Sequence, residues 1–392
     1  MKVLVITNLY PPHYLGGYEL LCKQVCDYLK KCGHEVDILT SDYMSSVDDD
    51  PSVHRSLRLI QNFGYAFKDS LSLRMKMPSV EKYNSKITSE RINTFKPDII
   101  FLWSQLRLTL GCALTAELSG IPVTYSLNDE WPRWYKPLKL KLNPGRIIKY
   151  TFRNIIAPTI TTDQLQFKNC VSISRCTRDG IASEVQTFTS KKVIYQGITP
   201  DDFPFKEKSP NGHTSRLLYV GQIYEDKGLT TLIEGLNILE KDNPSELTIV
   251  GDGPPEYLSI LKNKAKTLES KVDFTGKVVR SKLPEIYQQH DIFIFPSKFR
   301  EPFGLTHLEA MACGTPVVSS LSGGQKEFLK NKENCMTFET GNATDLAFKI
   351  KTLINDEELR LKIIQNARKE VEDNFTTERY LKEIHQHLMN LV

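Results

Sequence analysis

The sequence has no long hydrophobic run. No stretch approaches the roughly 20 apolar residues that a membrane-spanning helix needs, and the run Val3–Ile6 falls short of the roughly 7–15 apolar residues in a signal-peptide core. Cysteine pairs are missing too, since none of the eight cysteines form a C-x-x-C spacing. These absences argue against a membrane span, a zinc ribbon and a disulfide scaffold, and they favour a reducing cytoplasm.

A strong charge of one sign is also absent. The net charge is +4 over 392 residues, which is too small an excess to indicate nucleic-acid binding. The charge is uneven, because residues 1–198 carry 26 Lys and Arg against 18 Asp and Glu, whereas residues 199–392 carry 25 against 29. This length predicts two or three domains, and the asymmetry favours two domains with different partners.

Strand and helix patterns alternate along the chain. Lys2–Thr7 is an apolar strand pattern, Tyr18–Cys32 has helical spacing of its apolar residues, and Val36–Leu39 is the next strand pattern. The same alternation restarts after the prolines and charges of residues 200–210. Repeated βα units predict parallel sheets covered by helices on both faces. The fold class is therefore α/β, with two doubly wound, Rossmann-like domains and a boundary near residue 200.

Ligands of doubly wound sheets bind at the carboxyl ends of the strands, and three loops fall at such ends. The first loop ends in Gly16 and Gly17, directly before a helix, where the backbone can approach an anionic group. The second loop runs from Val220 to Gly228 and places Lys227 near a helix start. A lysine gains nothing from the helix dipole there, so it indicates a phosphate ligand, although a solvated surface lysine fits the same pattern.

The third loop carries two carboxylates eight positions apart. Glu301 lies in the loop, and Glu309 lies inside the following helix among apolar residues, where a charge is costly unless it is paired. Such a glutamate can accept hydrogen bonds from paired sugar hydroxyls. The amides that lead into this helix could bind a diphosphate, and they belong to Phe303, Gly304 and Leu305.

This third loop closely resembles the E-x7-E signature of the retaining GT-B glycosyltransferases of family four, also called glycosyl transferases group 1. The resemblance extends over most of the chain and includes these further segments: Gly16-Gly17, residues 193–198, Val250-Gly251-Asp252-Gly253-Pro254, residues 274–278, Phe295-Pro296-Ser297 and Ser322-Gly323-Gly324.

The resemblance implies a hexosyltransferase of GT-B fold. Residues 1–198 would form the acceptor-side domain, to which a last helix at about 377–392 returns, and residues 199–376 would bind a nucleotide-diphosphate sugar. A UDP-sugar is favoured over a GDP-sugar as the co-substrate, and no cofactor or metal is implied. The acceptor would be a glycan, a lipid-linked alcohol or a small-molecule alcohol.

The resemblance also assigns roles to individual residues. Glu301 would face the hydroxyls of the donor sugar, Glu309 would bind the ribose, and Lys227 would neutralise the diphosphate. The backbone of Gly276, Lys277 and Val278 would flank the nucleobase, while Gly16 and Gly17 would approach the diphosphate. The family retains anomeric configuration with no obvious enzymic nucleophile, because the leaving phosphate is thought to deprotonate the acceptor on the same face.

The sequence departs from the family pattern at two positions. Gln222 stands where an arginine is usual, so one contact to the diphosphate loses its charge. Asn128 stands where a histidine is usual; it can donate to a sugar hydroxyl but cannot carry a proton. Two alternatives follow: a non-catalytic relative that binds nucleotide or glycan, and a GT-B enzyme of another reaction, such as a nucleotide-sugar epimerase.

Residues 131–153 are basic and aromatic, with seven Lys and Arg and no acid. This composition is compatible with an acceptor lid or with peripheral contact to anionic lipid headgroups at the inner membrane face. It is equally compatible with a half-exposed element whose lysines extend toward solvent.

Overall fold

A computed structural model describes residues 1–44, 50–62, 70–137, 158–206 and 214–392. The chain divides into two compact units. Unit 1 comprises Met1–Ile194 and Leu381–Val392, and unit 2 comprises Tyr195–Tyr380. These limits lie a few residues from the boundaries at 198 and 377 that the sequence suggested.

Unit 1 is built on a parallel six-stranded sheet of order β3-β2-β1-β4-β5-β6. Its central strand β1 is buried throughout Val3–Ile6, because a parallel sheet with helices on both faces hides both sets of side chains. Its elements are β1 (Lys2–Ile6), α1 (Gly17–Lys31), β2 (Glu35–Ser41), β3 (Val53–Leu57), α2 (Leu71–Phe95), β4 (Ile99–Leu102), α3 (Gly111–Leu118), β5 (Val123–Leu127), β6 (Cys170–Ser172) and α5 (Arg175–Ala182).

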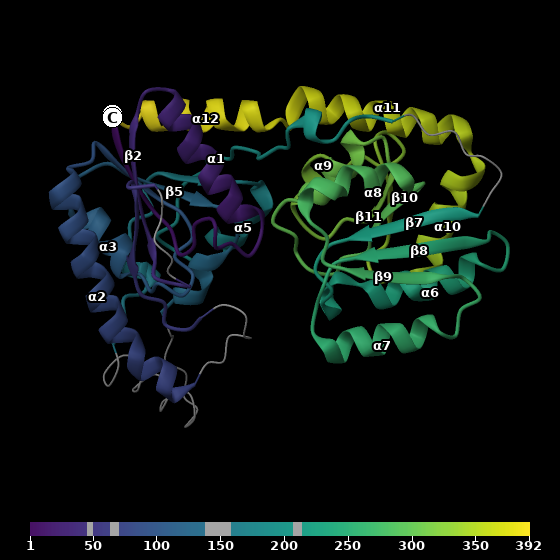
Figure 1. Ribbon diagram of the computed structural model, residues 1–392, viewed down its shortest axis with the longest axis horizontal. Coiled ribbons are helices and arrows are strands. Elements are labelled where there is room, and N and C mark those ends of the chain that lie inside the picture. The colour runs from purple at the N-terminus through teal and green to yellow at the C-terminus, as the bar shows by residue number, and fades with distance from the viewer. Residues whose placement is uncertain (45–49, 63–69, 138–157, 207–213) are drawn as a thin grey trace. The chain divides into compact units, whose positions relative to one another are not determined.

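Unit 2 repeats this topology with the order β12-β11-β10-β7-β8-β9, again parallel throughout (Figure 1). Numbered from its own first strand, the order is the same 3-2-1-4-5-6 arrangement as in unit 1. Its elements are β7 (Ser215–Val220), α6 (Leu229–Leu239), β8 (Ser245–Val250), α7 (Pro255–Ala265), β9 (Val272–Gly276), α8 (Leu283–Gln289), β10 (Ile292–Phe295), α9 (Leu305–Ala312), β11 (Val317–Ser320), β12 (Met336–Phe338), α10 (Ala343–Asn355) and α11 (Glu357–Asn374).

The predicted α/β class with two doubly wound sheets is confirmed. The last helix, expected at about 377–392, is α12 (Thr377–Met389). The sequence analysis missed β3 and the 25-residue α2. Helix α2 has little amphipathic pattern and contains Pro78, so neither its periodicity nor its composition marks it as a helix.

The last helix belongs to unit 1 from Leu381 onward. Its residues Ile384 and Leu388 are fully buried. His385 Nε2 lies 2.7 Å from His34 Nε2, and His387 Nε2 lies 2.9 Å from the hydroxyl of Thr124 on β5. Burial lowers the pKa of His387 to about 4, which keeps this contact uncharged at neutral pH.

The two ends of unit 2 are joined by backbone hydrogen bonds. The amide of Ile198 donates to the carbonyl of Phe375 at 3.0 Å, and the amide of Thr377 donates to the carbonyl of Ile198 at 2.8 Å. Gly197 permits this contact, because a Cβ atom there would lie 2.2 Å from the Phe375 carbonyl oxygen.

We expect Gly197→Ala to destabilise unit 2 by about 2 kcal/mol, because the added carbon overpacks a backbone contact that cannot yield. The free energy of unfolding in urea measures this loss. Gly235→Ala is the matched control: Gly235 lies within α6, and an added Cβ would lie 3.2 Å from the Leu346 side chain and 3.3 Å from the Ala343 carbonyl oxygen, which is far less overlap than at Gly197. Equal effects of the two substitutions would contradict the argument.

Candidate active site

The loops that follow β7, β8 and β10 pack backbone against backbone at the carboxyl edge of the second sheet. A Cβ atom on Gly251 would lie 1.8 Å from the carbonyl oxygen of Gly221, and one on Gly228 would lie 2.0 Å from that of Pro296. Gly251 also has φ +146°, a conformation that favours glycine. This close packing fixes where the loop with Lys227 stands relative to the loop with Glu301.

Lys227 and Glu301 form an ion pair, with Nζ 2.6 Å from Oε1. Only 13% of the lysine side chain and 11% of the glutamate side chain are exposed. The hydroxyl of Ser297 donates to the same carboxylate oxygen at 2.7 Å, and the ring of Phe299 lies 4.6 Å from Nζ. The structure therefore brings together two residues that the sequence analysis assigned to one site.

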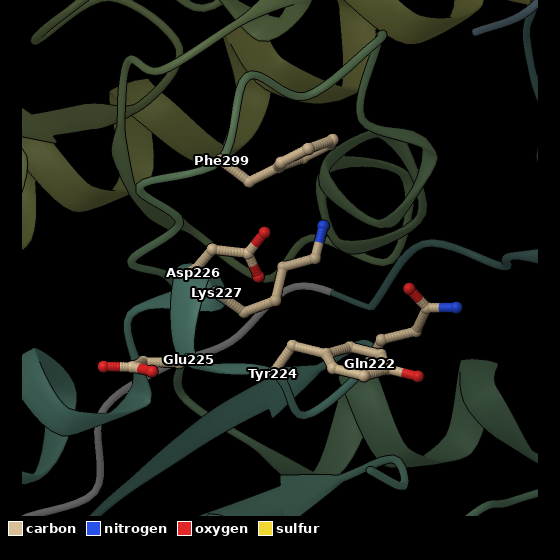
Figure 2. A pocket seen from close by; sticks show the side chains of 6 residues that line it. All are labelled: Gln222, Tyr224, Glu225, Asp226, Lys227 and Phe299. Carbon is tan, nitrogen blue, oxygen red and sulfur yellow. The ribbon is translucent and has the colours of Figure 1, made fainter. Parts of the chain in front are cut away.

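An open pocket of about 380 Å³ lies beside this pair. Figure 2 shows the Lys227 ammonium group pointing toward Phe299 and the Glu225 carboxylate pointing away from the other side chains. Gln222 belongs to the same pocket, and its backbone carbonyl accepts a 2.7 Å hydrogen bond from the Tyr219 hydroxyl. The lining residues are Gln222, Tyr224, Glu225, Asp226, Lys227 and Phe299.

Glu309 is more deeply buried than Glu301, with 2% of its side chain exposed. Its Oε1 pairs with Nη2 of Arg280 at 2.8 Å, and its Oε2 accepts a 3.1 Å hydrogen bond from the hydroxyl of Tyr287. Burial raises the pKa of Glu309, while Arg280 and Tyr287 act in the opposite direction. The sequence analysis missed Arg280 and Tyr287, which show no motif of their own.

The start of α9 presents backbone rather than side chains. The Phe303 side chain is buried in an aromatic cluster with Tyr195, Phe328 and Phe375, so only its backbone remains for a ligand. Gly304 and Leu305 lead into the helix. His307 is fully buried and bonded to Ser319 at 2.9 Å, and burial lowers its pKa to about 3, so it is a neutral structural residue.

The predicted nucleobase segment begins where β9 ends. Gly276 has φ +74°, and its carbonyl accepts a 3.0 Å hydrogen bond from the amide of Gly251. Lys277 is exposed and Val278 is half-buried. Arg280 follows after Val279, at the start of the short 3-10 helix η6 (Arg280–Lys282), and its pair with Glu309 links this segment to α9.

Unit 1 places its predicted residues together at one sheet edge. Helix α1 begins at Gly17, and Gly16 donates its amide to the Glu19 carboxylate at 3.1 Å. The Tyr18 hydroxyl donates to the backbone carbonyl of Ser126 at 2.6 Å.

Asn128 lies at the same edge, just beyond the end of β5. Its Oδ1 accepts a 3.0 Å hydrogen bond from the Ser126 hydroxyl, whereas its buried amide nitrogen has no partner among the residues that the structure describes. A buried donor without a partner costs about 1–3 kcal/mol. Asn128 therefore has a donor that the described structure leaves unused.

Asp129 is a titratable group that the sequence analysis did not select. Burial raises its pKa to about 6, and the nearby carboxylates of Glu19 and Glu130 add to the effect. The amide of Trp131 donates to Asp129 at 2.8 Å and opposes the shift. The sequence feature that could have identified Asp129 is its position directly after Asn128, at the carboxyl end of a buried strand.

The basic segment 131–153 is described only as far as residue 137, and residues 138–153 lie outside the described part. Arg133 pairs with Glu130 and Glu184, and Lys136 pairs with Glu184, so the described cations are matched by acids from elsewhere in unit 1. Among the described residues, no helix is long and apolar enough to cross a membrane. Peripheral membrane contact stays a prediction.

Solved structures share this fold. The crystal structure of Anabaena HepE in complex with UDP-glucose superposes with a TM-score of 0.69 at 20% identity, covering 100% of both chains. The two units, each with a doubly wound sheet, therefore have the GT-B fold.

The family itself follows from sequence models and relatives. The Glycosyltransferase Family 4 model matches residues 15–202, and the Glycosyl transferases group 1 model matches residues 201–370. An uncharacterized glycosyltransferase of Methanocaldococcus jannaschii is 27% identical over 98% of this chain and 96% of its own. A glycogen synthase of Mycobacterium tuberculosis is 29% identical over 96% of this chain and 91% of its own. The chain belongs to the group 1 glycosyltransferases, as the sequence resemblance predicted.

A double-mutant cycle tests whether the Lys227–Glu301 pair couples the two loops. For Lys227→Met and Glu301→Gln we expect a coupling free energy above about 1 kcal/mol in urea unfolding, because the pair is largely withdrawn from water. The Lys264–Glu234 pair is the control, with Nζ 3.1 Å from Oε1 and both side chains about half exposed. Its coupling should stay below about 0.5 kcal/mol, and equal couplings would refute the argument.

Asp129→Asn tests the buried carboxyl. Because the folded pKa of about 6 lies above the usual 3.8, the native protein gains stability as pH falls from about 6 to about 4. The variant lacks this gain, so we expect it to be about 1–2 kcal/mol more stable than the parent at pH 7.5, with the difference nearly gone at pH 4. Thermal unfolding at both pH values measures it. Asp179→Asn is the control, because 60% of that side chain is exposed. It should leave the stability unchanged at both pH values.

Proposed function

We propose that this glycosyltransferase moves a hexose from a UDP-sugar to an acceptor hydroxyl, without a metal ion and with retention of anomeric configuration. The observation that carries the proposal is the Lys227–Glu301 pair beside the open pocket of unit 2. A lysine in this position can replace Glu301 with a diphosphate as its counter-ion, and Glu301 is then released to accept hydrogen bonds from sugar hydroxyls.

The proposed donor follows the surroundings of this pair. Lys227 and Gln222 would bind the diphosphate together with the amides of Phe303, Gly304 and Leu305, which lead into α9. Glu309 would bind the ribose, and the backbone of residues 276–278 would flank the base. The UDP-glucose in the HepE complex supports uridine as the base. Gln222 supplies no charge, so Lys227 carries more of the diphosphate binding than in relatives with an arginine.

The proposed chemistry uses positioning and electrostatics. The bond between the sugar C1 and the diphosphate breaks, the acceptor oxygen bonds to C1 on the same face, and the acceptor proton passes to the departing phosphate oxygen. Lys227 stabilises the negative charge on that leaving group. Unit 1 would bind the acceptor. There Asn128, whose amide nitrogen has no partner among the described residues, would donate a hydrogen bond without transferring a proton.

Thermal unfolding with UDP, GDP and ADP tests the donor site. UDP at 100 times its dissociation constant should stabilise by about 2.7 kcal/mol. We expect this shift with UDP, unchanged by EDTA and abolished in Lys227→Met, while Lys264→Met at an exposed position keeps it. A chain that no nucleotide stabilises would contradict the proposal.

Transfer is the second measurement. Glu301→Gln and Lys227→Met should each lower kcat/KM for UDP-glucose at least about 100-fold, as is typical when a charge-stabilising contact is lost. The NMR coupling constant of the anomeric proton in the product reports retention or inversion. A β-configured product from UDP-α-glucose would refute the retaining mechanism and leave the donor assignment in place.

A further inference from the structure

Glu309 is a buried acid whose partners determine its orientation. It lies on α9 with 2% of its side chain exposed, a position in which an unpaired carboxylate is strongly unfavourable. The structure supplies one cation and one hydroxyl, each on a different carboxylate oxygen. These are Arg280 at 2.8 Å and Tyr287 at 3.1 Å.

Arg280 differs from Tyr287 in its exposure. Tyr287 is fully buried on α8, whereas 51% of the Arg280 side chain is exposed. The guanidinium carbon lies 5.7 Å from the centre of the buried Phe203 ring, which gives the side chain a second support. Arg280 thus reaches from solvent to Glu309, and it comes from the chain segment that directly follows residues 276–278.

The hydrogen-bonding capacity of Glu309 is only partly used. An ionised carboxylate offers about four acceptor positions on its two oxygens. Arg280 and Tyr287 occupy one position on each oxygen, which leaves about one on each. Two remaining acceptors on one rigid carboxylate match the two neighbouring hydroxyls of a ribose.

We propose that Arg280 is a positioning residue for the nucleotide, which holds Glu309 so that the two remaining acceptor positions take the 2′- and 3′-hydroxyls of the ribose. The inference rests on the proposed function, in which Glu309 is the ribose ligand. Arg280 acts through Glu309 and touches none of the reacting atoms.

The charge state of Glu309 gives the inference a second consequence. The titratable groups around the carboxylate in the described structure are Arg280 from η6 and Tyr287 from α8, with Cys313 beside Tyr287. Burial raises the pKa of Glu309 and Arg280 opposes that rise. Without Arg280 the carboxyl therefore protonates at a higher pH, and a protonated carboxyl is a poorer acceptor for two hydroxyls.

The experiment compares the affinities of UDP and 2′-deoxy-UDP by calorimetry in the parent, Arg280→Met and Glu309→Gln. We expect the parent to prefer UDP by about ten-fold, since a hydrogen bond to a charged group is worth about 1.5 kcal/mol or more. Both variants should lose most of that preference. The pH dependence is measured with UDP-glucose, because its diphosphate does not titrate near neutrality. Its binding should weaken in Arg280→Met as pH falls from 8 to 6 and should stay nearly constant in the parent.

Two further variants make the result decisive. Lys282→Met removes an exposed positive charge from the same 3-10 helix and should behave as the parent. Arg280→Lys keeps the charge and should restore part of the preference and the flat pH profile, even if Arg280→Met folds poorly. The inference is overturned if Arg280→Met keeps the preference of the parent, or if Lys282→Met loses it.

The outcomes also separate the inference from the proposed function. If Glu309→Gln loses the ribose preference but Arg280→Met and Arg280→Lys keep it, the ribose assignment stands and the role of Arg280 is refuted. If Glu309→Gln keeps the preference while Lys227→Met abolishes UDP binding, the diphosphate site stands and the ribose assignment fails. A parent chain that binds no UDP refutes both.

Discussion

The ion pair between Lys227 and Glu301 joins two loops that are 74 residues apart in sequence. Each charge on its own would be costly at this depth, and Ser297 and Phe299 further restrict where the two groups can stand. The pair therefore holds Lys227 in place at the wall of the pocket. Under the proposed function, an anion that competes for Lys227 would free Glu301 to accept hydrogen bonds from hydroxyl groups.

Much of the fold could be predicted from the sequence because the buried strands of parallel sheets have a recognisable pattern. Buried strands such as β1 and β10 are short continuous apolar runs, and helices follow them at regular spacing. Helix α2 was missed because its burial depends on packing against α3 and the sheet and not on an amphipathic pattern of its own. Glu301 could be selected because the E-x7-E motif carries it, and Lys227 because it stands near a helix start, but neither signal predicts that the two side chains are in contact.

The partners of Glu309 show a different limit. A glutamate inside an apolar helix predicts that some partner exists, but nothing local identifies Arg280, which lies in a polar stretch like many solvated arginines. Asp129 is similar, since its raised pKa arises from burial and from Glu19 on another element. In both cases the behaviour of one carboxyl group depends on its surroundings, and these are formed by chain segments that meet only after folding.

Although the two sheets have the same topology, their carboxyl edges differ in charge. At the start of α1 the Glu19 carboxylate already accepts the amide of Gly16, and Asp129 and Glu130 lie nearby, so this edge disfavours further negative charge. Its free donor is the neutral amide of Asn128. The edge of the second sheet instead presents Lys227, and Arg280 beyond it. Duplicated backbone geometry therefore does not imply duplicated chemistry: the first edge holds carboxylates and a neutral amide donor, whereas the second holds two buried glutamates that are each paired with a cation.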